Sequence, residues 1–282
     1  MRSRQRHLGQ FFTPQTVVDF ALETLRWRSG GGCRRLVDPA CGDGIFLRRA
    51  LELGLVELDG VWGVDKDATL ADSWSEWGQG PTQRVHLQVA DGLLSDLPDG
   101  TFDWVVGNPP YAGTGLKEAE TGMLQTILER YELARIRTAG KVGAAESLRR
   151  LPIEVLFVER FVSLCRPGGY LAILLPEGIF SNTRWRFVRE WLLEHVTLEA
   201  VVGLPRRTFS AGGITAKTCL AIAEHEPAPE GHQVLLAEVD SIGLKGTPNE
   251  LPELLAHWQK GEEVVSPRRP WRAKLPERKD WV

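Results

Sequence analysis

The segment Asn108-Pro109-Pro110-Tyr111 combines residue types that together could act on an amine. It follows the apolar run Phe102–Val106, which predicts a strand ending at Gly107. Two consecutive prolines restrict the backbone. Such a loop can direct an amide oxygen, a backbone carbonyl and an aromatic ring at one flat ligand that carries an amine. Because Asn-Pro also begins many plain turns, the segment alone leaves both interpretations open.

An acidic, glycine-containing loop follows an earlier predicted strand. The run Asp38-Pro39-Ala40-Cys41-Gly42-Asp43-Gly44 precedes a predicted helix, and its glycines permit close approach of the backbone to a ligand. Either Asp38 or Asp43 can face a cation, which suits a ligand with an ammonium group. Leu47 occupies the third glycine position of the Gly-x-Gly-x-x-Gly pattern, so the full dinucleotide-binding motif is absent. A tight turn between strand and helix remains the alternative.

Two further acids end predicted strands. Asp65 is placed to accept hydrogen bonds from two ribose hydroxyls, or to cap a helix. Asp91, followed by Gly92, can accept from the exocyclic amine of an adenine, or form a simple Asp-Gly turn. Open α/β sheets bind ligands at the carboxyl ends of their strands, so the four loops together predict one ligand site there.

The order of these motifs resembles the gamma class of DNA adenine-N6 methyltransferases. That class uses S-adenosylmethionine and includes the modification subunits of type I restriction systems. The resemblance covers roughly residues 8–239. It rests on Gly9-Gln10-Phe11-Phe12-Thr13-Pro14, then the Asp38 loop, Asp65, Asp91 and Asn108–Tyr111 in that order, with Pro167-Gly168-Gly169 and the Phe209 region completing the pattern.

The resemblance implies a site for S-adenosylmethionine. Thr13 would lie beside the methionine carboxylate and the Asp38 loop around the methionine part, whereas Asp65 would hold the ribose and Asp91 the adenine amine. Phe157 would pack near the cofactor ring, although its apolar neighbours also fit a plain core residue. Lys66 and Gly92 depart from the side chains common at their positions, which predicts a looser pocket. The implied cofactor-binding set is Phe12, Thr13, Asp38, Ala40, Gly42, Asp65, Lys66, Asp91, Gly92, Asn108 and Phe157.

The catalytic loop implied by the resemblance is Asn108, Pro109, Pro110 and Tyr111. The N6 lone pair of adenine is delocalised into the ring and is a weak nucleophile. The Asn108 side-chain oxygen and the Pro109 carbonyl would each accept one amine hydrogen, which localises the lone pair and directs it at the methyl group. Such direct transfer depends on positioning and preorganised electrostatics, with no covalent enzyme intermediate.

The expected substrate is double-stranded DNA with a flipped adenine, because a base inside a duplex cannot reach such a pocket. Tyr111 would stack on one face of the base and Phe209 on the other, while Arg206 and Arg207 would contact phosphates. Aromatic residues also pack in cores, and basic residues are often simply solvated. The expected partner is a target-recognition domain or specificity subunit, either missing from this chain or separate.

Strand-like and helical runs alternate along the chain, which predicts a Rossmann-like α/β fold with a mostly parallel sheet of seven strands and helices on both faces. Thr13 is predicted to cap a helix that begins at Pro14, and Pro167-Gly168-Gly169 to end a helix. The run Val234–Val239 could add one edge strand. The predicted strands are Arg35–Val37, Gly60–Val64, Val85–Ala90, Phe102–Val106, Tyr170–Leu175, Leu198–Val202 and Thr218–Ala223; helices are predicted over Ile45–Leu53, Glu154–Cys165 and Arg184–His195.

The domain organisation predicted from this pattern is a catalytic domain over residues 1–240 and an extension over 241–282. Residues 112–151 form a polar, glycine-bearing insertion, predicted to be helical and either surface decoration or a lid that faces the substrate. The extension contains a short helix, Leu251–Gln259, and a basic tail that is a possible link to a recognition domain.

Composition excludes several classes of protein. The 282 residues are 43% apolar and 25% charged, with no run of membrane-spanning length and no signal peptide, which predicts a cytoplasmic protein. Four isolated cysteines predict reduced thiols and no metal site. The formal charge of −3 gives no general attraction to nucleic acid. Methylation of an amine in RNA or of a glutamine side chain, and a catalytically silent scaffold, remain alternative functions.

Overall fold

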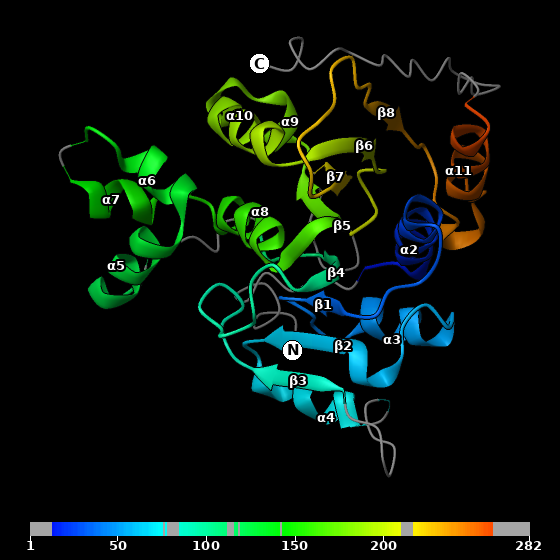
Figure 1. Ribbon diagram of the computed structural model, residues 1–282, viewed down its shortest axis with the longest axis horizontal. Helices are drawn as coiled ribbons and strands as arrows, with labels where there is room; N and C mark the ends of the chain where they lie inside the picture. The colour runs from blue at the N-terminus through cyan, green and yellow to red at the C-terminus, as the bar shows by residue number, and fades with distance from the viewer. Residues whose placement is uncertain are drawn as a thin grey trace.

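A central sheet organises the part of the chain that the structure describes (Figure 1). This computed structural model describes residues 13–75, 77, 85–111, 116–117, 119–141, 143–209 and 217–261. The strand order is β3-β2-β1-β4-β5-β7-β6-β8, and neighbours are parallel except where β7 pairs with β5 and β6. The strands are β1 (Leu36–Asp38), β2 (Val61–Asp65), β3 (His86–Val89), β4 (Phe102–Gly107), β5 (Cys165–Pro176), β6 (Thr197–Gly203), β7 (Thr218–Glu224) and β8 (Leu235–Glu238).

The strand order reverses between β1 and β4. The chain adds β2 and β3 on one side of β1 and then returns to place β4 on its other side. Loops on the two sides of such a reversal leave in opposite directions and open a crevice at the carboxyl ends of the strands. Asp38, Asp65 and Gly107 are the last residues of β1, β2 and β4, so the predicted motifs meet at this crevice.

Helices cover both faces of the sheet because side chains of a strand alternate between its faces. Along β5, Leu171 and Ile173 belong to one core cluster and Ala172 and Leu174 to the other. The helices α2 (Gln15–Ser29), α3 (Ile45–Glu52) and α11 (Leu251–Gln259) cover one face, and α8 (Ile153–Leu164) and α10 (Arg186–His195) the other (Figure 1). Shorter elements are α4 (Ala71–Ser75), α9 (Gly178–Ser181), η1 (Leu58–Gly60), η2 (Ala68–Leu70), η3 (Thr183–Trp185) and η5 (Leu244–Gly246).

The insertion after β4 contains α5 (Thr121–Arg130), α6 (Glu132–Thr138) and α7 (Ala144–Arg149), which lie beyond α8 from the sheet (Figure 1). Its apolar side chains, including Leu124 and Leu133, belong to the same core cluster as those of α8. The two carboxylate oxygens of Glu159 on α8 accept hydrogen bonds from the backbone N–H groups of Glu132 and Leu133, at 2.7 and 2.8 Å. The insertion is therefore helical, as predicted, and packs against the domain.

The structure corrects three local predictions. The sheet has eight strands among the described residues instead of seven, because the edge strand that the run Val234–Val239 could add forms as β8 and pairs in parallel with β6. Pro14, rather than Thr13, precedes the first helical residue, and no side chain caps that helix. Pro167, Gly168 and Gly169 lie inside β5, at a register shift opposite β4, and α8 already ends at Leu164. For β8 and for Pro167 to Gly169, pairing with distant strands decided the element.

Cys33, Cys41, Cys165 and Cys219 are all free cysteines in the structure. Across the described ranges, no cluster of three or more His, Cys, Asp or Glu side chains could hold a metal ion. Nor does any helix in those ranges have the length and apolar character needed to cross a membrane.

Candidate active site

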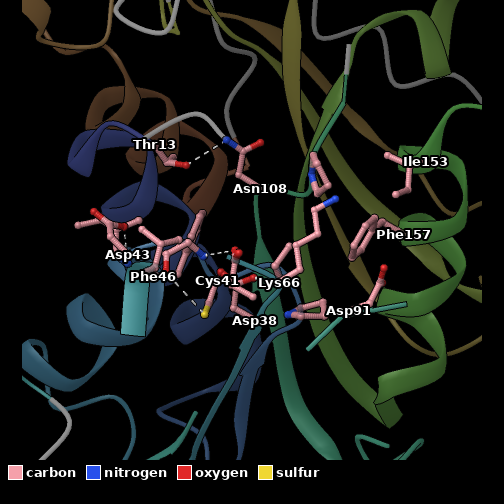
Figure 2. Close-up of a pocket in the computed structure, with 18 residues that line it drawn as sticks. Thr13, Asp38, Cys41, Asp43, Phe46, Lys66, Asp91, Asn108, Ile153 and Phe157 are labelled. Atoms are coloured by element: carbon pink, nitrogen blue, oxygen red, sulfur yellow. Dashed lines mark hydrogen bonds between the residues drawn. The ribbon is translucent and has the colours of Figure 1, made fainter. Parts of the chain in front are cut away.

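A pocket opens at the carboxyl ends of β1, β2, β3 and β4 (Figure 2). It encloses about 830 Å³, open solvent at its mouth included. Of the predicted cofactor set, Phe12 lies outside the described residues. The other ten all line the pocket: Thr13, Asp38, Ala40, Gly42, Asp65, Lys66, Asp91, Gly92, Asn108 and Phe157.

Asp38 lies at the base of the pocket, where its side chain is 1% exposed. Its Oδ1 atom accepts a hydrogen bond from the backbone N–H of Ala40 at 3.0 Å, which folds the loop after β1. Burial raises the pKa of Asp38 well above its usual range, because the charged form loses solvation. A cationic ligand group beside this carboxyl would oppose that shift.

Asp65 ties the end of β2 to the loop after β1. Its Oδ2 atom accepts from the backbone N–H of Gly42 at 2.8 Å, and its Oδ1 atom accepts from the N–H of Asp67 at 2.9 Å. The carbonyl of Gly42 is held in turn by the indole N–H of Trp74, at 2.8 Å. A Cβ on Gly42 would meet no protein atom within 4 Å, so the backbone there is open to a ligand. Burial raises the pKa of Asp65.

Asp91 and Gly92 form the third part of the pocket, after β3. The Oδ1 atom of Asp91 accepts from the N–H of Leu93 at 3.0 Å. A Cβ on Gly92 would lie 1.8 Å from the carbonyl oxygen of Pro39 and 3.4 Å from the ring of Phe157. The space that the missing side chain leaves is therefore occupied by the neighbouring loop. The expectation of a looser pocket finds no support at this position, whereas Lys66 still stands at the pocket wall.

The loop after β4 brings Asn108 against Thr13, and Figure 2 shows the two side chains pointing toward each other. The Nδ2 group of Asn108 donates to Oγ1 of Thr13 at 3.2 Å, across 95 positions of sequence. This bond orients the amide and leaves its oxygen on the other side of the group. Thr13 is thus a partner of the loop that is predicted to be catalytic. Pro110 also lines the pocket, and Pro109 lies between Asn108 and Pro110 in the chain.

The residues predicted to hold the substrate base are both buried. Tyr111 is 1% exposed, and burial raises its pKa above the usual range while a hydrogen bond with Asn108 opposes that shift. Phe209 is 3% exposed and belongs to the core cluster that contains α2. Stacking on a base stays a prediction that requires both rings to leave these positions. Arg206 and Arg207 are exposed just before Phe209.

Several lining residues were missed because apolar side chains in a sequence do not separate a pocket wall from a core. Ile45 and Phe46 begin α3, directly after the glycine loop, and Ile153 begins α8. Leu70 lies in η2, beyond Asp65. The signal for the first two was their position immediately after Gly44, since the first turn of that helix must face the same ligand.

Gly107 is predicted to be intolerant of a side chain. Its φ is +152°, and a Cβ there would lie 2.4 Å from Oδ1 of Asp38. Gly107→Ala should lower the free energy of unfolding by about 2–5 kcal/mol through backbone strain and overlap. Gly54→Ala is the matched control, because Gly54 has φ +64° but no atom within 4 Å of an added Cβ. Urea unfolding of both variants checks this, and equal losses would contradict the predicted overlap with Asp38.

Glu154, next to the pocket residue Ile153, predicts a pH-dependent stability. Its side chain is 9% exposed, and burial raises its pKa from its usual 4.5 to about 7. Between these values the folded chain binds more protons than the unfolded chain, so the free energy of unfolding falls as the pH rises through this range. In Glu154→Gln, the decrease in the free energy of unfolding over this pH range should be smaller than in wild type by roughly 3 kcal/mol.

Denaturant unfolding at pH 5 and pH 8 measures this effect as a difference between variant and wild type. Other buried carboxyls such as Glu199 also have raised pKa values and add to the fall in both proteins, so only the difference is diagnostic. Glu146→Gln is the control, since that side chain is 61% exposed. If Glu154→Gln follows the wild-type pH dependence, the raised pKa of Glu154 is wrong.

The fold is that of class I methyltransferases. In a structural comparison, a class I S-adenosylmethionine-dependent methyltransferase from Listeria monocytogenes matches with a TM-score of 0.62 and 24% identity over 88% of this chain and 71% of that one. The methyltransferase subunit of a type I restriction-modification system from Streptococcus thermophilus matches with a TM-score of 0.67 and 21% identity, covering 90% of this chain and 54% of that one. These comparisons confirm the predicted fold class.

The chain belongs to the N-6 DNA methylase family, whose model matches residues 2–251. The type II methyltransferase M.TthHB8I of Thermus thermophilus is 31% identical over 172 residues, which are 61% of this chain and 35% of that protein. The methylase subunit of the type I restriction enzyme MjaIX of Methanocaldococcus jannaschii is 23% identical over 71% of this chain and 35% of its own length. This chain thus spans about a third of both relatives.

S-adenosylmethionine is the cofactor of this family, and the pocket fits its chemistry. Asp38 and Asp43 provide carboxyls for an ammonium group, and Gly42 leaves backbone open to a ligand. Asp65 and Asp91 provide acceptors at adjacent strand ends, as a nucleoside requires. The apolar side chains of Phe46 and Phe157 add surfaces for its uncharged parts.

Proposed function

We propose that this chain is the catalytic part of a DNA methyltransferase that modifies the N6 amine of adenine, in a restriction-modification or phage-defence system. The observation that carries the proposal is the position of Asn108 to Tyr111 at the carboxyl end of β4, with Asn108 beside the cofactor pocket and bonded to Thr13. The family and the restriction-system relatives support DNA over RNA or a protein glutamine as the substrate.

The residues of the loop perform the chemistry by positioning the amine. When bound, S-adenosylmethionine supplies a methyl group activated by its sulfonium. The Asn108 oxygen and the Pro109 carbonyl each accept one N6 hydrogen, which concentrates the lone pair on nitrogen. Asn108 and Pro109 would hold the amine nitrogen in line with that methyl group, and the methylated amine would release one proton to solvent. Preorganised acceptors of this kind stabilise developing charge without reorganising during the reaction.

The role of Thr13 is to hold the Asn108 amide in one orientation. Because the Nδ2 group of Asn108 donates to Thr13, the amide oxygen is kept as the acceptor that faces the substrate amine. Tyr111 is buried and shares a hydrogen bond with Asn108. When the base arrives, its amine replaces Tyr111 as the hydrogen-bonding partner of Asn108. The Tyr111 ring is then able to stack on the base. Tyr111 and Phe209 hold the base, and Arg206 and Arg207 contact the backbone of the DNA.

The partner we propose is a target-recognition domain or specificity subunit. The support is the type I methylase subunit among the relatives and the type I methyltransferase subunit among the similar structures. With a formal charge of −3, the chain offers no general attraction to the phosphate backbone. Binding of DNA by the chain alone is therefore expected to weaken steeply as salt rises.

The test is methyl transfer from labelled S-adenosylmethionine at low salt. The acceptors are duplex and single-stranded DNA without adenine methylation, tRNA and a glutamine-bearing peptide, each at high concentration. Digestion to nucleosides and mass spectrometry should find N6-methyldeoxyadenosine from DNA and no label in RNA or peptide. Label in tRNA or peptide alone would replace the proposed substrate. Binding of the cofactor without transfer to any acceptor would favour the silent scaffold.

A further inference from the structure

The turn that carries Asp91 and Gly92 is held from outside the pocket. Within the turn, the N–H groups of Leu94 and Ser95 bond to the carbonyl of Asp91, at 3.0 and 2.8 Å. These bonds close the turn. The carbonyl oxygens of Gly92, Leu93 and Ser95 accept hydrogen bonds from side chains on α8 and on the insertion. Buried carbonyls require such donors, so the external partners determine where the turn can lie.

Arg160 on α8 is the main external partner, and its side chain is 0% exposed. Its Nε group donates to the carbonyl of Gly92 and its Nη2 group to the carbonyl of Ser95, both at 3.0 Å. Its Nη1 group donates to Oδ1 of Asp99 at 2.6 Å, which neutralises the buried charge. A planar guanidinium binds these acceptors in one fixed geometry, which the single ammonium of a lysine cannot reproduce.

The insertion supplies the other two partners. The hydroxyl of Tyr131, a residue 1% exposed between α5 and α6, donates to the carbonyl of Leu93 at 2.6 Å. Both Nη groups of Arg130 donate to the carbonyl of Ser95 at 3.2 Å. The insertion therefore contacts the backbone of the turn whose other side forms the pocket wall.

The turn has no freedom on its pocket side. Gly92 lies close to the Pro39 carbonyl and to the Phe157 ring, since an added Cβ would be 1.8 and 3.4 Å from them. A shift of the turn toward the pocket would therefore displace one of these two pocket residues. Phe157 and Arg160 lie three residues apart on α8, and hence on neighbouring positions of one helix face. Figure 2 shows Phe157 on α8 opposite Thr13 and Asn108, with Asp91 beside it. One helix thus supports both the ring and the turn.

We propose that Arg160 is a positioning residue for the cofactor pocket, and that Arg130 and Tyr131 couple the insertion to cofactor affinity by holding the same turn. The proposal rests on the proposed function, in which Asp91 accepts the adenine amine of the cofactor. The insertion then acts as part of the support of the pocket, in addition to any contact that it makes with substrate.

The test compares S-adenosylhomocysteine with S-inosylhomocysteine, in which a carbonyl replaces the 6-amine of the base and N1 carries a proton. Calorimetric titration of the wild-type chain should show tighter binding of the adenosyl form. Tyr131→Phe and Arg130→Met each remove donors to the turn, and should weaken the adenosyl form about 3- to 10-fold while weakening the inosyl form less. Arg160→Lys should weaken the adenosyl form by more than about tenfold.

Arg135→Met is the matched control. Arg135 is an exposed arginine of the insertion whose Nη1 group donates to the carbonyls of Leu128 and Glu129, so both affinities should stay within about twofold. Circular dichroism establishes whether each variant is folded. If Arg160→Lys does not fold, Tyr131→Phe still tests the proposal. Equal weakening of both ligands, or no change, would overturn the positioning role. Absence of binding by folded wild type would instead overturn the proposed cofactor pocket.

Discussion

Asn108→Ala is expected to lower the rate of methyl transfer at saturating S-adenosylmethionine by about 10²- to 10³-fold, the effect typical of losing one preorganised polar group at a reacting centre. The variant loses the acceptor for one amine hydrogen, so the N6 lone pair stays delocalised. Affinity for the cofactor should change little, because the acids of the pocket remain in place. Single-turnover kinetics with DNA, together with calorimetry, separate the two effects.

Asn249→Ala is the control for this prediction, since Asn249 is exposed and distant in sequence from the catalytic loop. A second variant, Thr13→Val, tests the orientation of the amide by removing the hydroxyl that accepts from the Asn108 Nδ2 group. It should reduce the rate by a smaller factor, about tenfold. Full activity of Asn108→Ala would show that the loop is not catalytic, whatever the fold.

Asp65→Ala is expected to weaken S-adenosylmethionine binding by about 10- to 100-fold. The carboxylate accepts from the N–H groups of Gly42 and Asp67, so its removal deprives both the loop after β1 and the start of η2 of their acceptor. The ribose hydroxyls lose the same group. Because two sides of the pocket depend on one side chain, the affinity should fall further than the loss of a single ligand contact would produce.

Calorimetric titration with S-adenosylmethionine measures this effect. Asp59→Ala is the matched control, because Asp59 is an exposed acid shortly before β2. The affinity of the Asp59→Ala variant for S-adenosylmethionine should equal that of wild type. Asp65→Asn separates shape from charge, since the amide keeps the volume but presents a donor toward one of the two N–H groups. An unchanged dissociation constant for Asp65→Ala would remove Asp65 from the site.

The motifs and their order were readable from sequence because they are local. Asp38, Asp65 and Asn108 follow apolar runs directly, and apolar runs in such a pattern predict buried strands. Since parallel strands end on one edge of the sheet, alternation of strands and helices was enough to bring these residues together. Glycines and prolines marked the loops, and Leu251–Gln259 is a helix with the predicted bounds.

Prediction was weakest where an element depended on a distant partner. The strand β8 is short and only half-buried, and its pairing with β6 identifies it. Pro167 to Gly169 resemble the end of a helix, yet they lie inside β5, between Cys165 and Tyr170, which both pair with β4. Tyr111 and Phe209 carry no local sign of whether their rings face a ligand or a core, because burial is a property of everything that surrounds a side chain.

The sequence by itself determined the family, the fold class and most of the residues around the pocket, since each depends on residue type and on spacing along the chain. Only the tertiary structure decided how those residues are held. The bond of Asn108 to Thr13 crosses 95 positions, and that of Arg160 to Gly92 crosses 68. Hydrogen bonds require donor and acceptor within about 3 Å and in line, and no local pattern specifies which distant segments will meet that condition.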